Sequence, residues 1–337
     1  MTLQERIDAL VELGERLKSE EEKVAAAKQL AYIHNKWFTV ENSQKAIDNI
    51  CSAFLNRTAL ENWVAAYDIE HQSPKTVGLV MAGNIPLVGF HDFISVFIAG
   101  HKAKIKLSEK DTVLMQLVFQ LLKEINPSFE HYLEIVDRLT DFDAVIATGS
   151  NNTARYFEAY FGKYPNIIRR NRTSVAVLTG KETKADLIAL GRDIFEYFGL
   201  GCRNVSKLFL PKGYDFNEMM EAFHTYKELV LHNKYKNNYD YSYTLLTMNK
   251  IPTVFGTCVL LSENESLQSR ISQVHYSYYE DEQVLKEILE SHLSDIQCIV
   301  SKNPVIDYSN VQFGETQIPS LIDYADGVDT MAFLTNL

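Results

Sequence analysis

The chain has 337 residues, 46% hydrophobic and 23% charged, which is typical of a globular protein long enough for two domains. Its net charge of −11 excludes a general role in binding nucleic acid. No apolar run reaches the ~20 residues that a membrane span needs. The four cysteines stand far apart and lack metal-ligand spacing. We therefore expect a cytoplasmic protein with reduced thiols, no metal, no nucleic-acid partner and no membrane span.

In chain order, the pattern begins with helices and continues with alternating strands and helices. Apolar side chains recur every three or four residues in 1–66, which predicts a helical N-terminus. From residue 75 onward, short apolar runs alternate with amphipathic segments, which predicts crossover units and a parallel sheet. Strands are expected at 76–81, 103–107, 133–136, 144–148, 175–179, 206–210, 244–248 and 297–300. Helices are expected up to residue 98 and at 111–125, 184–198, 216–229 and 282–293.

The first of three loops that each follow an expected strand contains Asn84. Open parallel sheets bind their ligands at such loops. In the run 83–86, the Asn84 amide could donate to a developing oxyanion. A turn-forming asparagine between glycine and proline is the alternative.

The other two loops carry groups that suit a nucleotide. In the run 106–109, Lys106 and Ser108 could hold ribose hydroxyls or a phosphate, and Glu109 could accept from a ribose diol. A solvated charged cluster is the alternative. In the run 148–152, backbone N–H groups could meet a phosphate, or Ser150 could simply cap a helix.

Cys202 lies between an expected helix and an expected strand, flanked by Gly199 and Gly201. Glycines let the backbone turn tightly and approach a ligand closely. A cysteine in this setting could act as a nucleophile through a covalent thioester. The alternative is a small buried side chain without chemistry.

The order of these three loops and the Cys202 segment resembles that of the aldehyde dehydrogenase superfamily. Residues 77–210 look like its cofactor half and nucleophile loop. The runs 198–206, 233–241 and 317–329 further resemble the acyl-CoA reductase family, the LuxC-type fatty acyl reductases of bacterial luminescence. The resemblance extends over nearly the full chain. It implies an α/β fold with a Rossmann-like cofactor lobe, a catalytic lobe and a helical N-terminus.

By this likeness we place the helical N-terminus and nucleotide-binding lobe in residues 1–180 and the catalytic lobe in 181–305. A C-terminal tail in 306–337 is expected to pack back on the lobes. Asn84 is then the oxyanion-hole amide and Cys202 the nucleophile. The implied cofactor-binding residues are Lys106, Ser108, Glu109, Gly149 and Ser150. The family implies NADPH, although a carboxylate near the ribose would repel a 2′-phosphate and favour NADH.

The run 168–174 departs from the oxidising dehydrogenases, which carry there a glutamate that activates water. It contains no carboxylate, and a reductase that discharges its acyl group by hydride needs none. Arg169, Arg170 and Arg172 in this run could meet the phosphates of CoA or of a nucleotide, or form a basic surface turn. Tyr239 could line an acyl or CoA channel, or pack in the core.

The sequence thus predicts an NAD(P)H-dependent acyl-CoA reductase that forms an aldehyde through an acyl-Cys202 intermediate. The acyl group would come from acyl-CoA or from a protein-bound thioester, with an acyl-activating partner protein as its source. The alternatives are an acyl-cysteine transferase or thioesterase without redox chemistry, and a non-catalytic scaffold. The interval 60–75 does not read as the hairpin through which dehydrogenases of this superfamily oligomerise, so the oligomeric state stays open.

Overall fold

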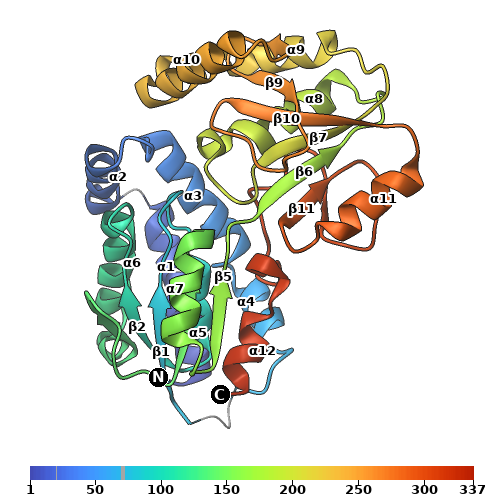
Figure 1. Ribbon diagram of the computed structural model, residues 1–337. Helices are drawn as coiled ribbons and strands as arrows, with labels where there is room; N and C mark the ends of the chain where they lie inside the picture. The colour runs from blue at the N-terminus through green and yellow to red at the C-terminus, as the bar shows by residue number, and fades with distance from the viewer. Residues whose placement is uncertain (20, 70–72) are drawn as a thin grey trace. The chain divides into compact units, whose positions relative to one another are not determined.

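Two compact units make up the computed structural model, which describes residues 1–19, 21–69 and 73–337 (Figure 1). Unit 1 comprises Met1–Asn171 and Pro319–Leu337, and unit 2 comprises Arg172–Ile318. The boundary expected at residue 180 thus falls inside unit 2. The expected tail 306–337 is divided between the units after residue 318. Part of the interval 60–75, where no hairpin was expected, lies outside the described residues.

The N-terminal part of unit 1 is helical, as expected. The Thr2 hydroxyl accepts the backbone N–H of Glu5, whose carboxylate in turn accepts the N–H of Thr2, so a capping box starts the first helix. The helices are α1 (Leu3–Lys18), α2 (Glu22–His34), α3 (Val40–Ala53) and α4 (Arg57–Val64). Their apolar faces belong to the core of unit 1.

A parallel five-stranded sheet in the order β3-β2-β1-β4-β5 forms the centre of unit 1. Its strands are β1 (Thr76–Val80), β2 (Lys102–Lys106), β3 (Leu133–Ile135), β4 (Ala144–Thr148) and β5 (Asn166–Arg169). The chain runs outward from β1 to β3 and then returns to the other side of β1 with β4. This reversal places the loops after β1 and β4 side by side, and such a point is where open α/β sheets bind ligands.

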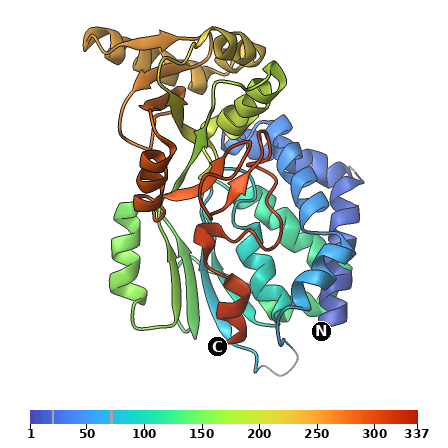
Figure 2. The ribbon, with the colours of Figure 1, turned by 90° about the vertical axis from the view of Figure 1, so that its right-hand side faces the viewer.

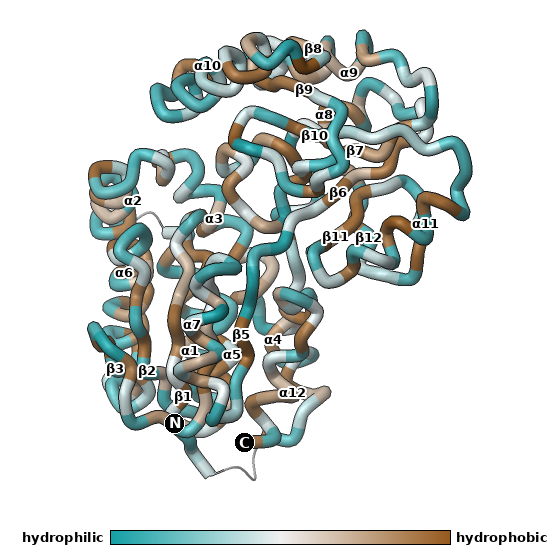
Figure 3. The backbone as a smooth tube through the Cα atoms, viewed as in Figure 1, coloured by the Kyte–Doolittle hydropathy of each residue, from teal (hydrophilic) through white to brown (hydrophobic). Residues whose placement is uncertain are grey.

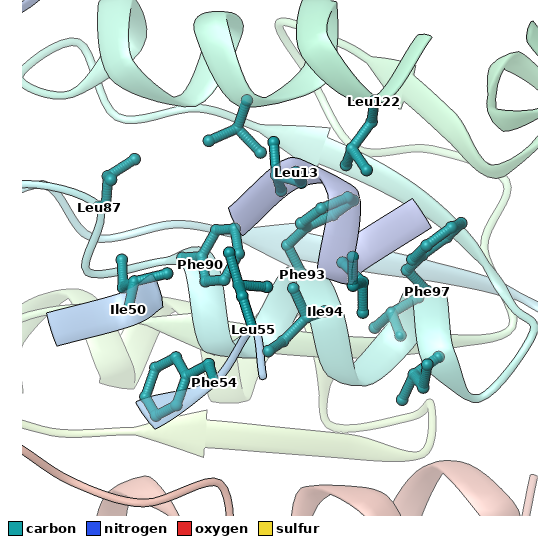
Figure 4. Packing of buried hydrophobic residues seen from close by; sticks show 14 of the residues in the cluster. Leu13, Ile50, Phe54, Leu55, Leu87, Phe90, Phe93, Ile94, Phe97 and Leu122 are labelled. Carbon is teal, nitrogen blue, oxygen red and sulfur yellow. The ribbon is translucent and has the colours of Figure 1, made fainter. Parts of the chain in front are cut away.

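Helices cover both faces of this sheet. Figure 2 shows α7 (Asn151–Phe161) on one face and the blue and teal helices of the N-terminal part on the other. The core lies on the latter face, where Phe90, Phe93 and Phe97 project from α5 (Phe90–Ile98) between α1 and α6 (Thr112–Ile125), as Figure 4 shows. The C-terminal helix α12 (Thr330–Thr335) contributes Met331 and Leu334 to the same core.

Unit 2 is built on a seven-stranded sheet in the order β12-β11-β6-β7-β10-β9-β8. All its pairings are parallel except that of β8 with β9. The strands are β6 (Thr173–Val177), β7 (Val205–Pro211), β8 (Thr253–Phe255), β9 (Leu260–Glu263), β10 (Gln273–Tyr279), β11 (Ile296–Val300) and β12 (Asn310–Val311). The helices are α8 (Lys184–Phe195), α9 (Asn217–Phe223), α10 (Asn233–Met248) and α11 (Glu282–Ser291). Figure 3 shows apolar segments along strands such as β1 and β11, with hydrophilic segments in many of the turns.

Several expected elements differ from the structure, which also contains short 3₁₀ helices: η1 (Pro127–Tyr132), η2 (Glu196–Gly199), η3 (His224–Leu231) and η4 (Ala325–Gly327). The strand expected at 244–248 is wrong, because these residues form the last part of α10. A short apolar run fits a strand or a buried helix equally well. The helix expected at 184–198 ends at Phe195, where η2 begins, and the one at 216–229 divides into α9 and η3.

Candidate active site

The three expected ligand loops of unit 1 follow β1, β2 and β4, at the carboxyl edge of its sheet. The first two are in direct contact. A Cβ atom added to Gly83 would lie 2.4 Å from Ser108 Oγ and 3.3 Å from Asp111 Cβ. Only glycine therefore allows the loop after β1 to lie against the loop after β2.

Asn84 is half-buried in the loop 83–89, whose shape depends on a neighbouring carboxylate. Leu87 adopts a left-handed conformation with φ of +57°, which costs energy in a residue with a side chain. Its N–H donates to Asp111 Oδ2 at 2.6 Å. Asp111, at the start of α6, thus ties the loop 83–89, which we call the asparagine loop, to the loop after β2.

Asp111 is itself unusual, since it is a deeply buried carboxyl group. Its second oxygen, Oδ1, has no hydrogen-bond partner among the described residues. Burial raises the pKa of Asp111 to about 7, although the Leu87 N–H acts in the opposite direction. The group therefore gains or loses its proton near neutral pH.

The loop after β2 presents the charged groups that were expected to contact a ribose. Lys106 ends the strand and is exposed, and Glu109 is exposed in the following turn. Ser108 is half-buried, and its Oγ accepts the Lys110 N–H at 3.3 Å. Ser108 thus shapes the turn that presents the two charged side chains.

The loop after β4 leads into the N-terminus of α7. Ser150 caps this helix, since its Oγ accepts the Thr153 N–H at 3.3 Å. A Cβ on Gly149 would lie 2.9 Å from the Phe157 ring, so a side chain at this position would have to displace that ring. The exposed helix start carries the partial positive charge that suits a pyrophosphate. Lys106, Glu109 and Ser150 thus lie on loops at the same edge of the sheet.

The arginines of the run 168–174 have different surroundings. Arg169 is buried, and its Nη1 contacts both carboxylate oxygens of Asp92 at 2.5 and 2.6 Å, so it is not available to a phosphate. Arg170 is exposed and forms an ion pair with Glu158 at 2.5 Å. Arg172, in unit 2, donates from Nη1 to the Ile296 carbonyl and the Tyr308 hydroxyl, each at 3.1 Å. It therefore holds β11 and the segment before β12.

Cys202 lies in unit 2, in a loop of residues 200–204 between η2 and β7 that we call the cysteine loop. Its side chain is exposed, whereas the other cysteines are buried. Burial raises the pKa of Cys51 and Cys258 to about 12 and that of Cys298 to about 11. Since the thiolate is the nucleophile, Cys202 is the cysteine of this chain that suits covalent chemistry.

A left-handed turn precedes the cysteine loop. Tyr197, Phe198 and Gly199 have φ values of +51°, +60° and +73°. Two of these residues carry buried aromatic side chains, so the turn is strained and must be held by packing. The Phe198 ring packs on His232 and Tyr235, with centroid distances of 4.4 and 5.9 Å.

The side chain of Asn204 holds the cysteine loop from within. Its Oδ1 accepts the Gly201 N–H at 2.8 Å. Its Nδ2 donates to the carbonyls of Asp193 at 3.0 Å and Glu196 at 2.9 Å. Asn204 is buried, so these bonds are shielded from water and tie the loop to the end of α8.

Tyr239, on α10, is half-buried and donates its hydroxyl proton to the Gly256 carbonyl at 2.8 Å. Burial raises its pKa. Tyr235, one turn earlier, is fully buried and donates to the Cys258 carbonyl at 2.8 Å. Both tyrosines thus hold the segment between α10 and β9 in place.

Two further features bear on the kind of site. Within residues 1–19, 21–69 and 73–337, no group of three or more His, Cys, Asp or Glu side chains could hold a metal ion. In the same part of the chain, no helix combines the length and the apolar character that crossing a membrane requires.

The fold is that of the aldehyde dehydrogenases. The chain is similar to aldehyde dehydrogenase 21 from Physcomitrella patens in complex with the product succinate, with a TM-score of 0.73 and 12% identity over 100% of this chain and 84% of that one. It is similar to betaine aldehyde dehydrogenase from Staphylococcus aureus in complex with NAD+, with a TM-score of 0.64 and 14% identity over 90% and 71% of the two chains. For the NAD+ complex of an aldehyde dehydrogenase from Bacillus cereus, the TM-score is 0.65 and the identity 15% over 90% and 72%.

These similarities confirm the expected fold class, with two α/β lobes and a helical N-terminus. At such low identity they establish the fold alone. No protein-family model and no curated protein matches the chain.

Sequence reasoning missed the residues that support the site. Asp111 stands where a helix cap is common, and nothing in its surroundings in the sequence marks it as buried. Asn204 follows the candidate nucleophile by two residues, and its burial was the missing information. Ser174 and Cys298 lie in apolar strands far apart in the chain, and only the pairing of β6 with β11 brings them together.

Proposed function

We propose that this chain is an NAD(P)H-dependent acyl-CoA reductase of the LuxC type, which converts an acyl thioester into an aldehyde. The observation that carries the proposal is the exposure of Cys202 on its strained, well-braced loop. The absence of a carboxylate in the run 168–174 supports reduction over hydrolysis.

In this proposal, the Cys202 thiolate attacks the carbonyl carbon of the acyl thioester. The bond to the carrier sulfur breaks, the carrier leaves as a thiolate, and the acyl group stays on Cys202. The Asn84 amide and the Cys202 backbone N–H are the proposed donors to the oxyanion that forms during the attack.

A bound reduced nicotinamide nucleotide would supply the hydride that converts the acyl group to an aldehyde. Lys106, Ser108 and Glu109 are the proposed contacts of the ribose. Gly149 and Ser150 are the proposed contacts of the pyrophosphate at the start of α7. Arg170, which is exposed, and Arg172 and Tyr239, which are half-buried, are the proposed contacts of the acyl carrier.

The missing carboxylate decides the fate of the acyl group. Hydrolysis of a thioester needs a base that removes a proton from water. Without that base, the acyl-cysteine persists until hydride arrives, and the product is the aldehyde rather than the acid. The acyl group would come from CoA or from an acyl-activating partner protein. Because Cys202 must stay reduced, we propose a cytoplasmic location.

Intact-mass spectrometry after incubation with acyl-CoAs of graded chain length tests the proposal. Without nucleotide, one acyl group should accumulate on the protein. With NADPH or NADH, it should disappear as aldehyde forms. Cys202→Ala should abolish both signals, while Cys258→Ala, which removes a buried thiol, should keep them. Acylation that turns over without nucleotide would instead identify a thioesterase or transferase, and no acylation would identify a scaffold.

A further inference from the structure

A buried hydrogen-bonded chain within unit 2 ends at the backbone of Cys202. The Oγ atom of Ser174, on β6, lies 3.1 Å from the Cys202 carbonyl oxygen and 3.1 Å from Cys298 Sγ, on β11. Ser174 and Cys298 are both fully buried. The chain thus links two strands of the sheet to the peptide that follows the proposed nucleophile.

The number of protons on Ser174 and Cys298 determines which group donates in each of these hydrogen bonds. A serine hydroxyl has one proton, which Ser174 donates to the Cys202 carbonyl. The bond to Cys298 must then be donated by the thiol. Burial raises the pKa of Cys298 to about 11, with Arg203 acting in the opposite direction, so the thiol keeps its proton at neutral pH.

The strand order makes Ser174 well placed for this role. β6 lies between β11 and β7, and β7 begins directly after the cysteine loop. The Ser174 N–H also donates to the Asn204 carbonyl at 3.3 Å. Ser174 therefore holds the cysteine loop through its backbone and through its side chain, from a strand in the interior of the sheet.

We propose that Ser174 and Cys298 are positioning residues that set the reactivity of Cys202 by fixing its carbonyl group. Fixing this peptide restricts rotation about the adjacent Cα–C bond, and with it the direction of the Cys202 side chain. A nucleophile that is held in its attacking geometry reacts faster than one that must find it. The inference rests on the proposed role of Cys202 as nucleophile, but the orientation of its thiol can be tested without substrate.

The first measurement is the rate at which iodoacetamide alkylates Cys202, followed by mass spectrometry across pH without nucleotide. Ser174→Ala should change this rate and the shape of its pH profile, because the carbonyl loses its donor. With acyl-CoA, the same variant should lower kcat about tenfold and leave KM nearly unchanged, since the effect lies in orientation.

Cys298 provides the rescue experiment. Cys298→Ala removes the thiol donor and should lower kcat about threefold. The lost hydrogen bond is neutral and acts on Cys202 only through Ser174. Cys298→Ser keeps a donor and should restore most of this loss. Cys258→Ala is the matched control. This buried thiol donates to the Phe223 carbonyl at 3.6 Å and takes no part in the hydrogen bonds of Ser174. It should leave both rates unchanged.

Equal alkylation and equal kcat in wild type and Ser174→Ala would overturn the inference. If Ser174→Ala fails to fold, the Cys298 pair decides: equal loss in Cys298→Ala and Cys298→Ser overturns it, and rescue by serine supports it. Failure of the proposed function is a separate result: aldehyde would then not form at all, or would still form in Cys202→Ala. The alkylation rates, which need no substrate, would still test the inference.

Discussion

At the scale of single residues, Asp111 joins the stability of unit 1 to the shape of the asparagine loop. One carboxylate oxygen accepts the Leu87 N–H, and the other has no partner in the described part of the chain. A buried charge without a counter-ion is costly, so the group favours its protonated form. The loop that carries Asn84 therefore depends on a side chain whose charge changes near neutral pH.

We expect Asp111→Asn to flatten the dependence of stability on pH. The pKa of Asp111 is about 7 in the folded protein, against an ordinary value of 3.8. Between these values the folded state keeps a proton that the unfolded state has lost, so stability is full below about pH 4 and falls as pH rises towards 7. Asparagine carries no charge at either pH. Between pH 5 and pH 8, the free energy of unfolding of the Asp111→Asn variant should therefore increase by roughly 3 kcal/mol relative to that of the wild type. Urea titrations at the two pH values measure this, and parallel pH profiles would refute it.

Glu109 is expected to set the choice between NADH and NADPH. Its exposed carboxylate lies in the turn proposed to contact the ribose. Glu109→Gln removes a negative charge that would repel a 2′-phosphate, so the affinity for NADPH should rise roughly fivefold to tenfold relative to NADH. Nucleotide fluorescence titrations give both dissociation constants. Glu41→Gln, which neutralises an exposed carboxylate on α3, controls for net charge, and an unchanged ratio in Glu109→Gln would exclude this role.

At the scale of elements, a buried ion pair attaches α12 to the sheet of unit 1. Arg169, at the end of β5, contacts Asp92 on α5 through Nη1. Its Nη2 donates to Thr330 Oγ1 at 2.9 Å, at the start of α12. One guanidinium thus connects a strand and two helices.

Asp92→Ala should destabilise unit 1 by about 3–5 kcal/mol, because it leaves the Arg169 charge buried without its counter-ion. Thr330→Val, which removes a single neutral acceptor, should cost only about 1–2 kcal/mol. Urea unfolding followed by tryptophan fluorescence compares the two, since Trp37 and Trp63 both lie in unit 1. Equal costs would show that the ion pair contributes little.

Elements with a continuous apolar run or a clear apolar period could mostly be predicted from the sequence, and several without such a pattern could not. β4 was predicted with its correct ends because the apolar run 144–147 follows a polar segment and Thr148 leads into a glycine and a serine. β10 was missed because its tyrosines, serine and histidine hide the burial of its middle residues. α10 was missed because asparagines and tyrosines dominate it, and little apolar periodicity remains.

The candidate site follows the same rule. Loops that come directly after strands could be placed from their position in the chain, which is how Asn84, Lys106 and Gly149 were selected. Their supports could not, because Asp111, Asn204 and Ser174 act through contacts that only the folded chain creates. The positive φ values of Tyr197 and Phe198 were equally hidden, since aromatic residues rarely adopt them.

At the scale of the whole molecule, unit 1 is made of two segments separated by all of unit 2. Residues 319–337 bring Tyr324, Met331 and Leu334 into the core of unit 1. The Tyr324 hydroxyl accepts the Trp63 Nε1–H at 2.7 Å, and the Leu334 carbonyl lies 3.0 Å from His101 Nε2. This segment therefore closes the core and satisfies buried polar groups.

Removal of residues 319–337 should open unit 1 and leave unit 2 folded. Trp63, His101 and Arg169 would lose hydrogen-bond partners, and apolar side chains of α5 would become exposed. Limited proteolysis with mass mapping should then show new cuts in α4 and α5 and none in β6 or β7. A cleavage pattern identical to that of the full chain would contradict the expectation.

The divided composition of unit 1 also has a consequence for biosynthesis. Ribosomes add about 5–20 residues each second, so residues 172–318 emerge over roughly 7 to 30 seconds. During that time the nascent unit 1 exposes the apolar surface that residues 319–337 later cover. Unit 2, whose residues are continuous, can fold in the same interval. The unit that begins at the N-terminus is therefore the one that completes its folding last.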